Sequence, residues 1–421
     1  MSGATTMAGS GTQVLGFAEA LGAVLRHAPG VRATGVEPVE LLASAGRVLA
    51  EDGVADRDQP PFDRATRDGF AVRAQEWTGG QRLRVVGQVR AGEEWAGAEM
   101  GAGAAIEIMT GAPVPAGANA VAMVEHSERE GDTIWAAAGR SLRAGENIVP
   151  RGSEARQGDV LLAAGTAMGA AEIAVAAACG RAELSAHKRP TVAIVATGDE
   201  LVEVDETPGA HQIRNSNGVA LAALVAAAGG ESRRLAIARD TREDVRARIE
   251  EGRRSDLLLL SGGVSAGKYD LVEEVLTELG AEFFFTGVSM QPGRPVVFGR
   301  LPAREGTSGA GCYFFGLPGN PVSTQVTFHC FVEPMLRAMC GARVAAPSFV
   351  QATLGEDVKG KAGLTRLLPA LLRHDLERPE VWLVGWQGSG DLAANARANC
   401  YAVLPDGRDL RAGDVITILL R

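Results

Sequence analysis

The sequence predicts a multidomain protein of class α/β plus β, with a central α/β domain whose parallel sheet is covered by helices on both faces. Three observations lead to this prediction. The chain has 421 residues, enough for about two to four domains. All-apolar strands alternate with helices between 190 and 342, which is typical of a parallel sheet buried on both sides. Short strands separated by glycine-rich turns dominate both flanking regions.

The N-terminal α/β module is predicted to span 12–189, after a small polar tail at 1–11 that we expect to be flexible. Apolar residues with helical spacing predict an amphipathic helix over 12–28, and a second short helix fits 38–49. An apolar helix is expected near 170–179. Between these helices lies a β-rich insertion at about 60–140, with strand-like segments at 82–89, 104–110 and 120–126.

The central domain is predicted to span 190–342, and its strands and helices alternate along the chain. The expected strands are 191–197, 233–238, 256–260, 282–288, 295–299 and 312–317. The expected helices are 221–230, 242–251, 271–280 and 322–339. Short β segments return in the last region, at 381–386, 400–405 and 415–420, and predict a small C-terminal β domain over 343–421.

Composition excludes several classes of protein. The net charge of −9 is the opposite of what a nucleic-acid backbone binder carries. No apolar run is long enough to span a bilayer, and the first residues lack the basic and apolar segments of a signal peptide. The five cysteines form no C-x-x-C pair, which is typical of free thiols in a reducing compartment. We therefore expect a cytoplasmic protein with no nucleic-acid and no membrane partner.

Polar residues follow the predicted strands of the central domain at the points where the strands end. Glu200 follows the first strand, Asp240 the second, and the glycine turn SGGVS at 261–265 the third, with Asp270 close behind. The loop LPGNP at 317–321 follows the last strand. Because ligands bind outside the carboxyl ends of strands in open parallel sheets, we expect these groups to face one rim.

The chemistry of this rim is that of an anion site next to a metal. Glycines let backbone N–H groups approach an anion, so the turn formed by Ser261, Gly262, Gly263 and Ser265 is a plausible phosphate cradle. Carboxylates such as Glu200, Asp240 and Asp270 are ligands suited to Mg²⁺, or one of them acts as a general base. Each residue also has a purely structural interpretation: Asp240 fits a helix N-cap and Gly-Gly a simple turn.

The stretch from Gly262 to Lys268 matches most of a nucleotide-binding phosphate loop, G-x-x-x-x-G-K. The next position of that pattern carries Ser or Thr, whose hydroxyl holds Mg²⁺. Here it is Tyr269, which cannot take that role. The pattern therefore argues against an ordinary nucleotide-binding loop.

Ten motifs occur in an order and spacing that resemble the MoeA family, the molybdopterin molybdenumtransferases. The resemblance covers nearly the whole chain. The motifs are PPFDRATRDGFA at 60–71, IMTGAPVPAGANAVAMVE at 108–125, GENI at 145–148, TGDEL at 197–201, QIRNSN at 212–217, SGGVSAGKYD at 261–270, QPGRPVVFG at 291–299, GLPGNPVS at 316–323, QGSGDL at 387–392 and ANCYAVLP at 398–405.

The resemblance implies both a fold and an activity. The central region would be a three-layer α/β/α molybdopterin-binding domain with a mostly parallel sheet, and the C-terminal domain would be barrel-like. The enzyme would insert molybdenum from molybdate into the dithiolene of adenylylated molybdopterin and release AMP, assisted by Mg²⁺. This is the final step of molybdenum cofactor synthesis.

The family's site positions fall on residues spread over all three regions of this chain. Those implied as catalytic are Asp68, Thr110, Glu200, Asp240 and Asp270, of which the last three would hold the metal. Those implied as substrate-binding are Ser261, Gly262, Gly263, Ser265, Arg294, Pro318, Gly319, Asn320, Pro321 and Ser389.

The resemblance also implies partners. Family members are elongated homodimers in which the N-terminal module of one subunit completes the cleft on the other, so Asp68 and Thr110 would reach the site in trans. An upstream molybdopterin adenylyltransferase and downstream apo-molybdoenzymes are further possible partners.

Four departures from the family pattern lie in the N-terminal half: Arg67 for Met, Phe70 for Tyr, Asn119 for Asp, and Val149 for Arg. Arg151, two residues further on, could compensate for Val149. These changes also fit a paralogue tuned to another oxyanion, such as tungstate. Asp68 and Thr110 can alternatively be turn and capping residues, the prolines turn formers, and Arg294 a solvated surface residue.

Two other functions fit the same residues. One is a scaffold or carrier that binds the pterin without catalysis, and the other is a phosphoanhydride hydrolase built on the same α/β domain. A nucleotide triphosphatase would turn over ATP without pterin.

Overall fold

The structure is a computed structural model that describes residues 13–31, 34–263, 271–303, 311–374 and 378–421. Its central domain holds a six-stranded sheet in the order β17-β14-β18-β22-β21-β19. The strands are β17 (Glu231–Arg234), β14 (Thr191–Ala196), β18 (Leu257–Ser261), β22 (Cys312–Leu317), β21 (Val297–Leu301) and β19 (Glu282–Phe285). Only β21 runs against its neighbours, so the predicted mostly parallel sheet is confirmed.

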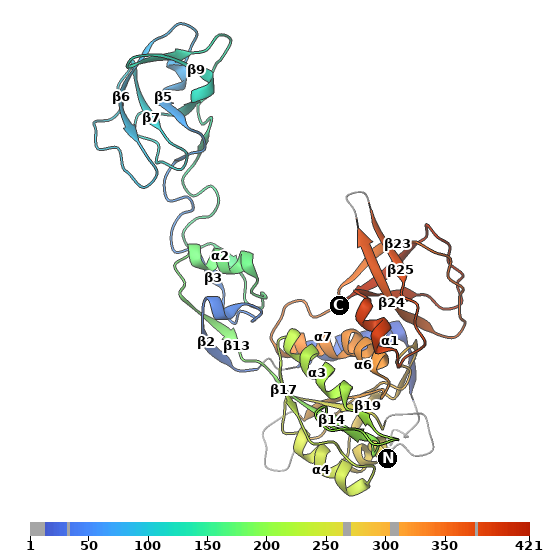
Figure 1. Ribbon diagram of the computed structural model, residues 1–421. Coiled ribbons are helices and arrows are strands. Elements are labelled where there is room, and N and C mark those ends of the chain that lie inside the picture. The colour runs from blue at the N-terminus through green and yellow to red at the C-terminus, as the bar shows by residue number, and fades with distance from the viewer. Residues whose placement is uncertain (1–12, 32–33, 264–270, 304–310, 375–377) are drawn as a thin grey trace, which may run out of the picture.

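Helices cover both faces of this sheet and complete the predicted three layers (Figure 1). Alternate residues of a strand face opposite sides. Accordingly, Leu257 and Leu259 pack in one core while Leu258 and Leu260 pack in the other. The first core is shared with α3 (Ser216–Ala227), α6 (Pro321–Thr327) and α7 (Glu333–Met339), and the second with α4 (Arg242–Gly252) and α5 (Leu271–Glu278). A π-helical turn, Phe328–Val332, joins α6 to α7 in the segment predicted as one helix.

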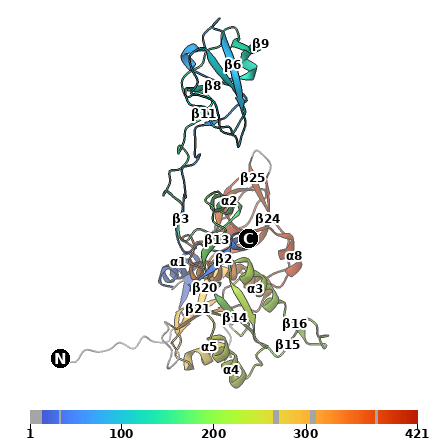
Figure 2. The same cartoon turned by 90° about the vertical axis from the view of Figure 1, so that its left-hand side faces the viewer.

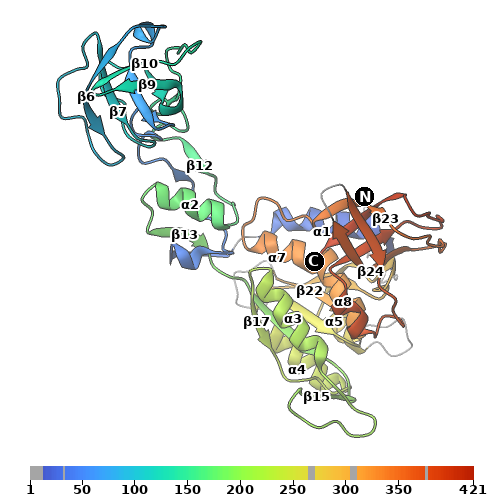
Figure 3. The ribbon, with the colours of Figure 1, turned by 45° about the horizontal axis from the view of Figure 1, so that its top comes forward.

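The first helix, α1 (Phe17–His27), does not pack with the rest of the N-terminal module, to which the sequence pattern assigned it. Its residues Ala20 and Val24 are fully buried in the core of the α/β domain. Strand β1 (Val14–Gly16) pairs with β20 (Gly287–Gln291), and Figure 3 shows α1 beside α7. The apolar stripe of this amphipathic helix identified a buried face but not its partner, because periodicity carries no information on which core a helix joins.

The remaining N-terminal module is an arm that carries a β domain at its tip (Figures 1 and 2). The arm contains β2 (Val36–Glu40) paired with β13 (Glu183–His187), β3 (Gly53–Val54) paired with β12 (Val160–Leu162), and α2 (Ala170–Ala178). The tip is a six-stranded sheet in the order β8-β5-β7-β6-β10-β9. Its strands are β5 (Gly69–Val72), β6 (Leu83–Val89), β7 (Ala104–Ile108), β8 (Ala120–Met123), β9 (Ser127–Glu130) and β10 (Thr133–Ala136). A short ladder between β4 (Arg64–Ala65) and β11 (Ile148–Val149) lies at its base.

Three sequence-based element assignments are wrong. The helix expected over 38–49 is strand β2 followed by a short 3-10 helix, Leu42–Ser44. Pro38 would stand at the first position of the expected helix, where proline is tolerated, so it does not exclude a helix. The pairing of β2 with β13 makes the segment a strand. The strand expected over 282–288 is two strands, β19 and β20, which belong to different sheets. The strand expected over 233–238 lies at Glu231–Arg234 instead.

The C-terminal domain is a closed barrel of five strands, so the expected barrel-like β domain is confirmed. Its strands are β23 (Phe349–Leu354), β24 (Thr365–His374), β25 (Pro379–Leu383), β26 (Cys400–Leu404) and β27 (Val415–Leu420). Pairing of β24 with both β25 and β26 closes the barrel. Helix α8 (Leu392–Arg397) lies on it and contacts α6 of the α/β domain. Within the described residues, no helix has the length and apolar character needed to cross a membrane.

Candidate active site

A cavity of about 930 Å³ lies at the carboxyl ends of β14, β18 and β22, where the sequence predicted a common rim. Its wall is formed by the loops after these strands, by the loop before α4, and by one residue of the C-terminal domain, Gly390. Nine of the predicted site residues line it: Glu200, Asp240, Ser261, Gly262, Gly263, Pro318, Gly319, Asn320 and Pro321.

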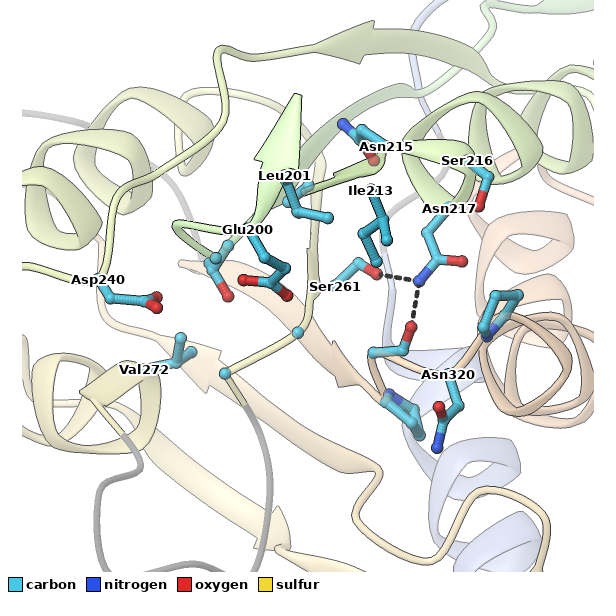
Figure 4. Close-up of a pocket in the computed structure, with 18 of the residues that line it drawn as sticks. Glu200, Leu201, Ile213, Asn215, Ser216, Asn217, Asp240, Ser261, Val272 and Asn320 are labelled. Atoms are coloured by element: carbon cyan, nitrogen blue, oxygen red, sulfur yellow. Dashed lines mark hydrogen bonds between the residues drawn. The ribbon is translucent and has the colours of Figure 1, made fainter. Parts of the chain in front are cut away.

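The acidic end of the cavity is formed by Glu200 and Asp240, both exposed (Figure 4). Gly198 has φ +145°, and a Cβ on it would lie 2.4 Å from the Glu200 carboxylate, so glycine leaves room for that side chain. The N–H groups of Asp199 and Asp240 each donate to the other residue's carboxylate, at 3.4 and 3.3 Å. This reciprocal pair joins the loop after β14 to the loop before α4.

Asp240 is not the N-cap of α4. Thr241 takes that role, because its hydroxyl accepts a hydrogen bond from the N–H of Asp244. The interpretation of Asp240 as the helix N-cap is therefore wrong. Its side chain remains available to the cavity.

The glycine turn after β18 forms the middle of the cavity. Gly262 and Gly263 have φ +93° and +66°, and a Cβ on either would come within 3.1 Å of Thr197 Oγ1. Thr197 is only 5% exposed and lines the cavity, and its hydroxyl has no hydrogen-bond partner among the described residues. A buried hydroxyl of this kind is available to a ligand oxygen. The sequence analysis did not single out Thr197, because an apolar strand precedes it without a break.

Two asparagines at the start of α3 lie at the end of the cavity opposite the carboxylates. Asn217 Nδ2 donates to Ser261 Oγ at 3.1 Å and to the Gly319 carbonyl at 2.7 Å, as Figure 4 shows. Asn215 is buried and caps α3, because its Oδ1 accepts from the Gly218 N–H. Both were part of the motif QIRNSN but were not predicted individually. Their position between a strand and a helix start was the available signal.

Two further predicted substrate-binding residues lie beside the cavity without lining it. The Ser389 carbonyl accepts a hydrogen bond from the Val322 N–H at 2.9 Å, and its neighbour Gly390 lines the cavity. Arg294 is exposed, and its neighbour Pro295 lines the cavity. Ser265 and Asp270 lie outside the described residues.

Asp68 and Thr110 lie together at the tip of the arm, far from the cavity of the same chain. Asp68 directly precedes β5 and Thr110 follows β7 (Figure 1). The Thr110 N–H donates to Asp68 Oδ1 at 2.7 Å, and this backbone hydrogen bond is the main cause that lowers the pKa of Asp68. Both residues are exposed, so the pair can approach a second molecule.

The departures in the N-terminal half have local structural roles. Asn119 Oδ1 accepts from the Ala74 N–H at 2.7 Å, a turn contact that a carboxylate could also make. The Arg151 guanidinium pairs with Asp58 at 2.7 Å. Arg67 is exposed next to Asp68 and donates to the Thr66 carbonyl.

The acidic end of the cavity carries two carboxylates, Glu200 and Asp240. Mg²⁺ in proteins is usually held by one or two carboxylates, with substrate phosphates and water completing its shell. Glu200 and Asp240 supply two exposed carboxylates in one cavity, next to a glycine turn suited to phosphate. Within the described part of the chain, no group of three or more His, Cys, Asp or Glu residues could hold a metal ion.

Comparison with known proteins covers most of the chain. Residues 15–180 match the MoeA N-terminal region (domain I and II), residues 193–338 a probable molybdopterin binding domain, and residues 351–420 the MoeA C-terminal region (domain IV). The molybdopterin molybdenumtransferase of Staphylococcus aureus (strain COL) is 35% identical over 392 residues, or 91% of this chain and 90% of that protein. Its counterpart in Staphylococcus epidermidis is 32% identical over the same shares.

Solved structures agree with the sequence relatives. The molybdopterin biosynthesis MoeA protein of Pyrococcus horikoshii OT3 has a TM-score of 0.79 and 30% identity, covering 97% of this chain and all of that chain. The family resemblance and the fold class predicted from the sequence are thus confirmed. The chain belongs to the MoeA family of molybdopterin molybdenumtransferases.

Proposed function

We propose that this protein is a molybdopterin molybdenumtransferase that inserts molybdenum from molybdate into the dithiolene of adenylylated molybdopterin and releases AMP. The observation that carries the proposal is the cavity in which two carboxylates, a glycine turn and a set of amides meet. Relatives that match this chain over 90% of their own length carry the name of this activity. The carrier and hydrolase alternatives have no observation that favours them.

The two ends of the cavity have different proposed roles, one binding phosphate and the other binding the metal. The glycine turn at Ser261 and Gly262 faces the pterin phosphate, and the buried Thr197 hydroxyl, which has no partner among the described residues, donates to it. Glu200 and Asp240 hold Mg²⁺, with Asp270 as a third proposed ligand outside the described residues. When bound, Mg²⁺ neutralises the phosphoanhydride and makes its phosphorus more electrophilic.

The chemical step is cleavage of the anhydride between the pterin phosphate and AMP. An oxygen of water or of molybdate attacks the phosphorus, the anhydride P–O bond breaks, and AMP leaves with the second phosphate remaining on the pterin. As the adenylate leaves, two Mo–S bonds form to the dithiolene and one Mo–O bond breaks. The released oxygen leaves as water with the two thiol protons, or stays on the phosphorus when molybdate is the nucleophile. The protein contributes positioning and electrostatics, while the two sulfur ligands belong to the substrate. The five protein cysteines are all buried, so none is offered to the metal.

We also propose the assembly and setting of this enzyme. It acts as a homodimer in the cytoplasm, and the Asp68–Thr110 pair of one subunit completes the cavity of the other. An adenylyltransferase that makes the substrate and apo-molybdoenzymes that take the product are its proposed partners. Arg294 and Ser389 contact the substrate from the edge of the cavity.

The test measures AMP release from adenylylated molybdopterin with Mg²⁺, with and without molybdate. We expect wild-type protein to release AMP only when molybdate is present, and Glu200→Ala or Asp240→Ala to slow release about 100-fold or more. Glu203→Ala is the matched control, because Glu203 lies near Glu200 but pairs with Arg234 and does not line the cavity.

Each alternative has its own outcome in this assay. AMP release without molybdate would indicate a hydrolase, binding without release a carrier, and ATP turnover without pterin a triphosphatase. Near-normal release by the Glu200 and Asp240 variants would show that these carboxylates have no catalytic role.

A further inference from the structure

A small flap forms one edge of the cavity and extends outward from the α/β domain (Figures 2 and 3). It consists of β15 (Leu201–Val202) and β16 (Ile213–Arg214), which pair in parallel with Leu201 opposite Ile213. Residues opposite each other on paired strands direct their side chains to the same face. Leu201 and Ile213 therefore form one continuous apolar surface, which Figure 4 shows between Glu200 and Asn217.

This surface is exposed although it is apolar. Ile213 lines the cavity with 58% of its area accessible to water, and Leu201 is partly exposed beside it. Among the described residues, its neighbours in the cavity include the Glu200 carboxylate, the Asn217 amide and the backbone of Gly262. When a ligand covers an exposed branched apolar side chain at such a site, the burial of apolar surface makes the free energy of binding more favourable.

The backbone of the flap is held in place by hydrogen bonds to the site itself. The Ile213 N–H donates to the Glu200 carbonyl, and the Asn215 N–H donates to the Val202 carbonyl, both at 2.8 Å. Arg214 Nε donates to the Glu206 carbonyl at 3.1 Å within the flap. The apolar surface is thus tied directly to the residue proposed to bind the metal, and a group resting on it would lie beside the phosphate region.

The shape and chemistry of the surroundings suit a flat ring. The cavity of about 930 Å³, which Leu201 and Ile213 line together with Gly262 and Gly263, is large enough to admit such a ring. Carboxylate and amide groups on either side can meet the polar edge of a heteroaromatic ring, while its face covers the two aliphatic side chains.

We propose that Leu201 and Ile213 form a platform for a planar heteroaromatic ring of the ligand. This inference rests on the proposed function, because the adenylylated ligand supplies two rings of this chemistry, the pterin and the adenine. The platform sets affinity for whichever ring it carries.

The test measures dissociation constants of the full-length protein by titration calorimetry, separately for AMP and for metal-free molybdopterin. We expect Ile213→Ala to weaken binding of one of the two about tenfold, the loss typical of removing a few buried methyl groups. Ile213→Leu should remain within about threefold of wild type. Val204→Ala is the matched control: Val204 lies just beyond β15 and is 46% exposed, but it does not line the cavity.

Which of the two ligands loses affinity identifies the ring that lies on the platform. Loss of affinity for AMP alone places the adenine on the platform, and loss for molybdopterin alone places the pterin there. Equal affinities for Ile213→Ala and wild type toward both ligands, or the same loss in Val204→Ala, overturn the inference. Because binding is measured without turnover, a failure of the proposed reaction would appear separately, as a wild-type protein that binds the ligands but releases no AMP.

Discussion

At the scale of single residues, Gly262 shows how the site depends on backbone that only glycine allows. Its φ is +93°, and a Cβ would lie 2.7 Å from the Thr197 carbonyl oxygen, which belongs to the neighbouring strand end and cannot move freely. Gly319 lines the same cavity, but a Cβ there would meet its nearest atom at 3.7 Å, an ordinary contact. The two glycines therefore differ in what a methyl group would cost.

We predict that Gly262→Ala lowers the free energy of unfolding by about 1–3 kcal/mol, because the positive φ and the close contact both strain the backbone. Gly319→Ala should change it by less than about 0.5 kcal/mol. Urea unfolding of both variants checks this difference. Equal stabilities would show that the turn relaxes around the added methyl group.

At the scale of elements, helix α8 of the barrel positions the loop that precedes it beside the cavity. Asp391 caps α8, and its carboxylate accepts hydrogen bonds from the N–H groups of Ala394 and Gln387. Asn395, 1% exposed, donates from Nδ2 to Gln325 of α6 at 2.9 Å. Asp391 thus closes the loop that contains Ser389 and Gly390. The loop is held against the α/β domain by Asn395 and by the Ser389 carbonyl, which accepts from the Val322 N–H.

The Asp391 cap predicts a pH dependence. The backbone hydrogen bonds from Ala394 and Gln387 lower the pKa of Asp391 below its ordinary value of 3.8. A carboxyl whose folded pKa is lowered stabilises the fold above its unfolded pKa, and this stabilisation is lost as the pH falls through the folded pKa. We therefore expect Asp391→Asn to be less stable than wild type at about pH 7, with the difference shrinking below about pH 4.

Urea midpoints of wild type and Asp391→Asn, measured between about pH 7 and pH 3, check this expectation. A difference that stays constant over the whole range would mean that the charge of Asp391 does not contribute and that the cap acts only through its shape.

At the scale of the whole molecule, the arm separates two groups of proposed site residues. Glu200 and Asp240 lie at the rim of the α/β domain, while Asp68 and Thr110 lie on the β domain at the end of the arm (Figure 1). In the proposed homodimer, the two groups act together across two subunits. The arm is therefore the physical basis of the proposed shared site.

We predict complementation between two inactive variants. When Asp68→Ala and Glu200→Ala subunits are mixed and allowed to exchange, half of the dimers are mixed and each mixed dimer has one intact site. AMP release should recover to about one quarter of wild type. A mixture of Glu200→Ala and Asp240→Ala subunits is the control and should stay inactive, because every site then lacks one of the two. No recovery in the first mixture would place Asp68 outside the site of the partner.

The predictable parts of the fold were those with strong local signals. The strand 256–260 is apolar throughout because both of its faces are buried, and β18 lies there. The helices α4 and α5 were recognisable from their spacing. By contrast, the segment around Pro38 has a local pattern that fits a helix, and only its pairing with β13 makes it a strand. A long-range partner of this kind leaves no trace in the local sequence.

The site residues also separate into those that the sequence could predict and those that it could not. The strand-end residues Glu200, Asp240 and Gly262 could be expected at one rim, because the order of strands and loops alone determines which ends meet. Thr197, Asn217 and the apolar pair Leu201 and Ile213 could not, because each depends on which neighbour it meets across the cavity. The side-chain amide of Asn217 acquires its role only when the glycine turn and the Gly319 loop come within hydrogen-bond distance of it.

The sequence by itself determined the family, the three-part domain order and the acidic, glycine-rich character of the rim, because motifs and strand periodicity are properties of neighbouring residues. Only the tertiary structure decided that α1 joins the α/β core, that Asp68 and Thr110 lie at the end of an arm, and that Ile213 is exposed inside the cavity. These features follow from contacts between residues far apart in the chain, whose energies depend on packing and not on local pattern.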